Sequence, residues 1–102
     1  MKFGPYLKKC RINASLTQRE LARRCGLSDA YINRVENQEA DPPTHKVCAA
    51  LARALGIDAK DLWKCAFMAR LDRWLRNEGF KNTPEGLVSA FFDDLTDRAA
   101  KD

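Results

Sequence analysis

The sequence contains few of the residues that metal sites and enzymes need. Histidine occurs once, as His45, and none of the four cysteines belongs to a C-x-x-C pair. A zinc or redox site would need paired ligands at short spacing. The sequence also shows no nucleophile–base or acid–base constellation. We therefore expect no metal, no cofactor and no enzymatic activity.

Long apolar runs are also missing. No stretch approaches the roughly 20 apolar residues of a membrane-spanning helix, and the first residues lack the apolar segment of a secretory signal. We expect a cytoplasmic protein that does not contact a membrane. The cysteines fall on apolar faces of predicted helices, where they are best interpreted as small buried hydrophobic groups: Cys10, Cys25, Cys48 and Cys65.

Alternating apolar and polar residues, the pattern of a strand, do not persist anywhere in the sequence. Capping residues and apolar spacings of three and four instead predict six helices. These cover about residues 5–13, 17–26, 28–37, 44–56, 58–77 and 83–95. The chain has 102 residues, 45 % of them hydrophobic, which suits one small all-α domain with an extension.

Charge is distributed unevenly along the chain. Residues 1–57 carry ten basic and five acidic side chains, a net charge of +5. Residues 58–102 carry eight basic and nine acidic side chains, a net charge of −1. A basic first half beside a nearly neutral second half indicates that the first half meets a polyanion.

The region from residue 17 to residue 35 has the spacing of two helices joined by a tight turn. Thr17 and Glu20 form a capping box, Gly26 supplies the positive φ of the turn, and Ser28 caps the next helix. Small Ala22 allows close packing, and Ile32 with Val35 would anchor the second helix to the core. This pattern is typical of a helix-turn-helix.

Four segments in order strengthen this interpretation: LKKCR at 7–11, LTQRELA at 16–22, VEN at 35–37 and ALGI at 54–57. With them the chain resembles the lambda-repressor-like (Cro/CI, XRE-type) DNA-binding family over about residues 7–62. Ser15 and Gln38 stand where that family usually has glycine. The resemblance implies a five-helix DNA-binding domain at 1–62, followed by a helical extension at 63–102.

The resemblance also implies roles for individual residues. The helix at 28–37 would lie in the major groove of double-stranded DNA. Its base-reading residues would be Ser28, Asp29, Ala30, Asn33 and Arg34, and the phosphate contacts would come from Gln18, Arg19, Asn37 and Lys46. Arg11 and Glu36 would form a structural ion pair. Arg34 is the leading candidate for direct readout, because its guanidinium matches guanine O6 and N7.

Asp29 and three arginines of the preceding helix also have interpretations that do not involve DNA. Asp29 stands at a helix N-terminus, where a carboxylate favours the helix dipole by ~0.3–1 kcal/mol, or it could accept a hydrogen bond from cytosine. The basic side chains Arg19, Arg23 and Arg24 could instead be a solvated helix face.

Residues 63–102 carry more large apolar groups than a simple tail would need. Six of them are candidates for a homodimer interface across a two-fold axis: Trp63, Phe67, Leu71, Trp74, Phe91 and Phe92. Alternatively, the last helices fold back and enlarge the core of the same domain.

The sequence therefore predicts a sequence-specific transcriptional regulator, expected to be a repressor, that binds DNA as a homodimer. One alternative is an antitoxin that binds its toxin through residues 63–102. Another is a protein-interaction adaptor that keeps the fold but has lost DNA binding.

Overall fold

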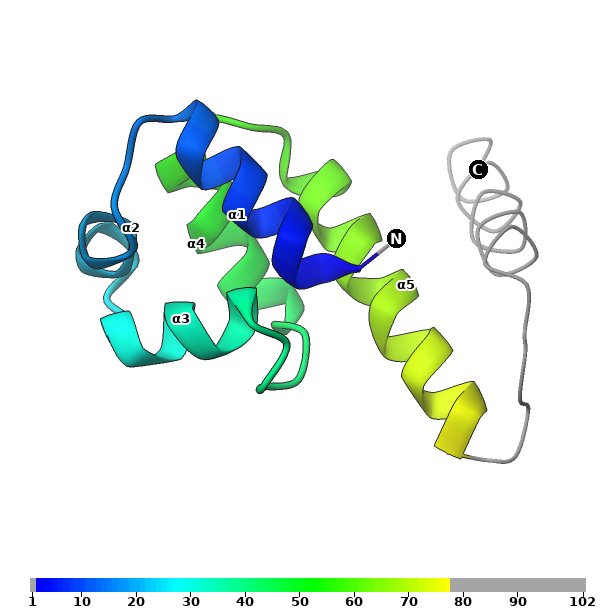
Figure 1. Ribbon diagram of the computed structural model, residues 1–102. Helices are drawn as coiled ribbons and strands as arrows, with labels where there is room; N and C mark the ends of the chain where they lie inside the picture. Colours follow the sequence, from blue (N-terminus) through cyan, green and yellow to red (C-terminus); the bar gives the residue numbers. More distant parts are fainter. Residues whose placement is uncertain (1, 78–102) are drawn as a thin grey trace, which may run out of the picture.

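The computed structural model describes residues 2–77, which form five helices around one core (Figure 1). These are α1 (Phe3–Asn13), α2 (Gln18–Cys25), α3 (Asp29–Glu36), α4 (His45–Leu55) and α5 (Ala59–Asn77). α4 packs against α2 and α5, while α1 packs against α3 and α5. This arrangement confirms the all-α prediction. The helix expected at 83–95, with Phe91 and Phe92, lies outside the described residues.

Local hydrogen bonds fix where α2 and α3 begin. The Glu20 N–H donates to Thr17 Oγ1 over 3.0 Å, and the Thr17 N–H donates to Glu20 Oε1 over 3.1 Å, which completes the predicted capping box. Ser28 Oγ accepts from the Tyr31 N–H over 3.0 Å. Both caps depend on residues close in sequence, and both were therefore predictable.

The beginnings of α4 and α5 differ from each other. Thr44 is the N-cap of α4 and has extended backbone, but its side chain makes no capping hydrogen bond. Thr44 is thus of a residue type that often caps helices, but its hydroxyl does not cap α4. Asp58 does cap α5, because its Oδ1 accepts from the Lys60 N–H over 2.8 Å.

Within residues 2–77, four positions have a left-handed backbone, two of them at residues other than glycine. Gly26 has a φ of 69° in the joint between α2 and α3, as predicted. Ser15 and Gln38, which stand where the family usually has glycine, have φ values of 59° and 61°. The turn geometry is thus kept at a cost in backbone strain. Gly56 ends α4 with a φ of 71°.

One apolar core joins the five helices. Its largest fully buried side chains are Leu7, Leu21, Ile32, Leu51, Leu62 and Cys48. Cys65 and Ala66 belong to the same core, and α5 continues through residue 62 without a break. Residues of α5 beyond residue 62 thus contribute to the same core. No helix within residues 2–77 is long and apolar enough to cross a membrane.

The start of α1 lies directly against the end of α3. A Cβ atom added at Gly4 would lie 2.5 Å from the carbonyl oxygen of Glu36 and 2.7 Å from that of Val35. Only glycine allows two backbones to approach this closely. The contact fixes the position of the last turn of α3 against α1.

Candidate nucleic-acid interface

α3 has one buried face and one exposed face. Ile32 and Val35 are 0 % and 2 % exposed, and they anchor the helix in the core. The opposite face carries only exposed residues, and they are the ones proposed from the sequence for base reading: Ser28, Asp29, Ala30, Asn33 and Arg34. The register of the two anchors turns these residues outward, since positions three and four apart share a helix face.

The first two members of this face are already engaged at the helix N-terminus. Ser28 Oγ is the α3 cap, and Asp29 Oδ1 accepts from the Ala30 N–H over 3.1 Å. This local bond is compatible with the helix-dipole role of Asp29. The contact of Asp29 with cytosine stays a prediction.

An open groove runs between the beginnings of α2 and α3. Gln18, Arg19, Asp29, Ala30 and Asn33 are among the residues that line it, so two proposed phosphate contacts lie beside three proposed base readers. Arg23 lines a neighbouring hollow together with Arg19, Ser28 and Asp29.

Three proposed DNA contacts lie outside both hollows. Arg34 is exposed on the last turn of α3, Asn37 is the exposed C-cap of that helix, and Lys46 is exposed at the start of α4. The structure thus brings α2 and the first turn of α3 together, and leaves Lys46 on a separate helix.

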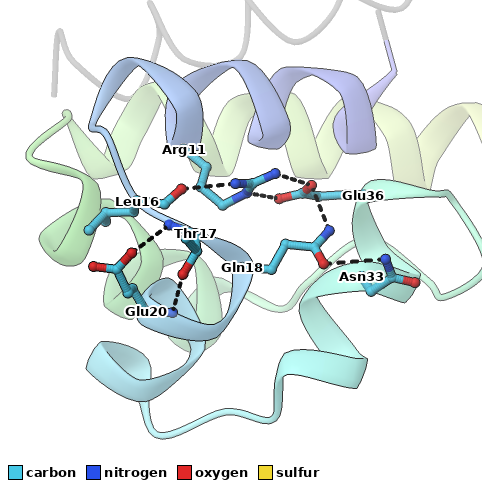
Figure 2. Close-up of polar contacts among 7 residues, drawn as sticks. All are labelled: Arg11, Leu16, Thr17, Gln18, Glu20, Asn33 and Glu36. Carbon is cyan, nitrogen blue, oxygen red and sulfur yellow. Dashed lines mark hydrogen bonds and ion pairs between the residues drawn. The ribbon is translucent and has the colours of Figure 1, made fainter.

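Beneath this face, Arg11 and Glu36 form an ion pair that joins α1 to α3 (Figure 2). Arg11 Nε donates to Glu36 Oε2 over 2.6 Å, and Arg11 Nη2 donates to Oε1 over 3.0 Å. The remaining nitrogen, Nη1, donates to the carbonyl of Leu16 over 2.8 Å. The hydrogen bonds to Glu36 raise the pKa of Arg11 further above its ordinary value. The side chain of Glu36 is 1 % exposed.

Gln18 connects this buried pair to the exposed face of α3. Its Nε2 donates to Glu36 Oε1 over 3.1 Å, and its Oε1 accepts from Asn33 Nδ2 over 3.3 Å (Figure 2). Asn33 Oδ1 in turn accepts from Asn37 Nδ2 over 3.1 Å. The sequence interpretation treated these three amides as separate DNA contacts and missed their connection, because the connection depends on how α2 crosses α3.

The proposed dimer residues differ in exposure. Trp74 is 56 % exposed, whereas Trp63, Phe67 and Leu71 are half-buried. Trp63 packs against the core, with its ring edge-on to His45 at 5.0 Å between centroids and to Phe67 at 5.8 Å. Within residues 59–77 the exposed part of this set is therefore centred on Trp74.

None of the four cysteines, all of which lie within residues 2–77, forms a disulfide bond. Cys48 and Cys65 are buried, and burial raises the pKa of each thiol to about 11. Cys10 and Cys25 are half-buried. Thiols with such a raised pKa stay protonated near neutral pH, which is unfavourable for metal binding. Within residues 2–77, no group of three His, Cys, Asp or Glu side chains could hold a metal ion.

A short joint between α2 and α3, with α3 exposing a polar face, defines a helix-turn-helix protein. The helix-turn-helix family matches residues 7–62, more than half of the chain. The chain belongs to this family, in its lambda-repressor-like (XRE-type) form. This is a family of DNA-binding regulators rather than of enzymes.

One similar protein is the propionyl-CoA carboxylase regulator of Cereibacter sphaeroides, which is 37 % identical over 59 residues. The match covers 58 % of this chain and 13 % of that regulator, so the chain spans only a small part of its relative's length. No solved structure matches the chain.

Proposed function

We propose that the chain is a sequence-specific DNA-binding transcriptional regulator, acting as a repressor, that reads the major groove with α3. The observation that carries this proposal is the two-sided α3, whose Ile32 and Val35 are buried while its polar residues are exposed. Membership in the helix-turn-helix family and the regulator named among its relatives support the same function.

The chemistry of the side chains separates base-reading residues from phosphate-contacting residues. Arg34 presents a guanidinium that suits guanine O6 and N7, and Asn33 presents an amide that suits adenine. The phosphate contacts belong to Gln18, Arg19, Asn37 and Lys46, which hold the helix in register but carry no sequence information directly. Arg23 and Arg24 at the end of α2 are exposed and add positive charge.

Repression needs no surface beyond the one that binds DNA, because a protein seated on a promoter excludes the polymerase by occupying its site. In a homodimer each protomer would contribute one α3, and the two helices would lie about one DNA turn apart. We assign the contact between protomers to α5, centred on Trp74, with Phe91 and Phe92 as further contributors.

The experiment is selection of bound duplexes from a random pool with the purified full chain, followed by titration of the enriched duplex at several salt concentrations. Log affinity should fall with log salt with a slope of several units, because phosphate contacts release counterions. A pool that never enriches, or an affinity that stays unchanged from low to high salt, would overturn the proposal. Placing the enriched site in a reporter promoter tests repression, since expression should fall.

A further inference from the structure

Three amide side chains link a buried carboxylate to the exposed face of α3. Asn37 donates to Asn33 over 3.1 Å, Asn33 donates to Gln18 over 3.3 Å, and Gln18 donates to Glu36 over 3.1 Å. The three hydrogen bonds form a series in which every residue donates to the next one, ending at Glu36.

The carboxylate sets this direction. An ionised carboxylate can only accept hydrogen bonds, so the Gln18 side chain must turn its NH₂ group toward Glu36. Its oxygen then faces Asn33, which must respond with its own NH₂ group. Arg11 keeps Glu36 ionised and fixed in place, with hydrogen bonds of 2.6 Å and 3.0 Å.

Reversal of the Asn33 amide would be unfavourable at Gln18. Its Oδ1 would face the Oε1 of Gln18, which places two acceptors together, whereas the exposed amide of Asn37 can turn to match either orientation. The orientation of Asn33 is therefore selected by Glu36, a residue that lies in the protein interior with 6 % of its surface exposed.

The fixed orientation leaves Asn33 with a defined set of unused groups. The amide has two N–H donors and two oxygen lone pairs. The hydrogen bonds to Gln18 and Asn37 use one donor and one lone pair. One donor and one acceptor remain on an exposed side chain of α3. Adenine matches both groups in the major groove, because its N7 is an acceptor and its N6 is a donor. Guanine presents two acceptors, O6 and N7, so it can bind the free donor of Asn33 but not the free acceptor.

We infer that Asn33 reads an adenine and that Gln18 is the positioning residue that holds its amide in the reading orientation. This inference rests on the proposed DNA binding and deepens it. Gln18 acquires a role in sequence specificity, in addition to the uniform phosphate contact that the family resemblance implies.

The test measures base preference with the full chain and the selected duplex. Each base pair of the duplex is replaced in turn, and the affinities of wild type and Asn33→Ala are compared. The base pair at which the wild type has a preference and Asn33→Ala has none is the one that Asn33 reads. The wild type should prefer adenine there by about tenfold, as expected for a bidentate contact. Gln18→Ala should reduce this preference to about twofold or less, because Asn33 then has both N–H donors free and can offer them to the two acceptors of guanine.

Arg19→Ala is the matched control, since Arg19 is the next residue on α2 and lines the same groove. It should weaken binding to all duplexes by one common factor and leave the adenine preference intact. The double variant Gln18→Ala/Asn33→Ala should lose no more preference at this pair than Asn33→Ala alone, because the two residues act as a unit.

Nuclear magnetic resonance of the free protein gives a readout that needs no DNA. The two side-chain N–H signals of Asn33 should be resolved in the wild type and should shift in Gln18→Ala. The inference is overturned if Gln18→Ala binds DNA with an unchanged adenine preference, or if the base read by Asn33 is not adenine. Absence of binding to any selected duplex would instead overturn the proposed function itself, and the inference with it.

Discussion

Arg11 and Glu36 tie α1 to the end of α3 through two hydrogen bonds, of 2.6 Å and 3.0 Å. The side chains are 12 % and 1 % exposed, so the pair lies almost entirely out of solvent. Removing one partner of such a pair leaves a buried charge without compensation and commonly costs about 3–5 kcal/mol. α3 is thus held in place by a contact that lies beneath its exposed face.

Arg11→Ala should therefore lower the free energy of unfolding by about 3 kcal/mol. Urea unfolding followed by circular dichroism measures the change. Arg11→Lys is the matched control, since it keeps the charge but loses the forked geometry, and it should recover only part of the loss. A loss below about 1 kcal/mol for Arg11→Ala, the range of exposed ion pairs, would contradict the account.

Gly4→Ala tests the close approach of α1 to α3. Alanine normally favours a helix over glycine by about 0.5–1 kcal/mol. Here the new Cβ would lie 2.5 Å from the Glu36 carbonyl oxygen, so the two helices must separate. We expect a net destabilisation of about 1–3 kcal/mol, typical of overpacking.

Gly26→Ala provides the comparison for this variant. A Cβ at Gly26 would meet nothing within 4 Å, so its cost comes only from the φ of 69°. Thermal unfolding of both variants separates the two causes, and only Gly4→Ala should perturb the amide resonances of the last turn of α3. Stabilisation by Gly4→Ala would show that the helices do not need this contact.

Glu20 makes stability depend on pH. Its hydrogen bonds with the backbone and side chain of Thr17 lower its pKa below the ordinary value of 4.5. Since the folded state binds this proton less tightly than the unfolded state, the stabilisation is present above about pH 4.5 and is lost as the pH falls through the folded pKa.

Glu20→Gln keeps an acceptor in the capping box but cannot titrate. The difference in unfolding free energy between wild type and Glu20→Gln should shrink as the pH is lowered below about 4.5. Glu39→Gln is the control, because Glu39 is exposed and outside the helices. A difference that stays constant from pH 7 to pH 3, the range to be scanned by denaturant unfolding, would contradict the role of the Glu20 charge.

Trp74 tests the proposed homodimer. Burial of a large apolar side chain stabilises an interface by about 1.5–3 kcal/mol, so Trp74→Ser should raise the dimer dissociation constant by about tenfold or more. Ile12→Ser on α1 is a matched control, since Ile12 is also 56 % exposed. Sedimentation equilibrium measures both variants. A full chain that sediments as a monomer at roughly tens of micromolar would reject the dimer.

Local features of the fold were predictable because they depend on neighbours in sequence. The Thr17–Glu20 box, the positive φ of Gly26 and the inward register of Ile32 and Val35 all follow from spacing. The Arg11–Glu36 ion pair followed only from the family resemblance, since 25 residues separate its partners.

Features that depend on helix crossing could not be predicted. Gln18 meets Asn33 only because α2 and α3 cross at the beginning of α2, and no spacing rule encodes that contact. The core contribution of Cys65 and Ala66, on the turn of α5 that follows residue 62, likewise depends on how α5 packs against the other helices. Thr44 had the right residue type for a cap, yet its side chain makes no capping bond.

Arg34 provides the most direct measurement of the central claim, that α3 reads DNA sequence. The measurement is the affinity of wild type and Arg34→Ala for the selected duplex and for each of its single base-pair replacements. We expect Arg34→Ala to lose about 1–3 kcal/mol on the best site and to lose its preference at one base pair per half-site, with the other preferences kept. An Arg34→Ala profile parallel to that of the wild type at every base pair would contradict the claim.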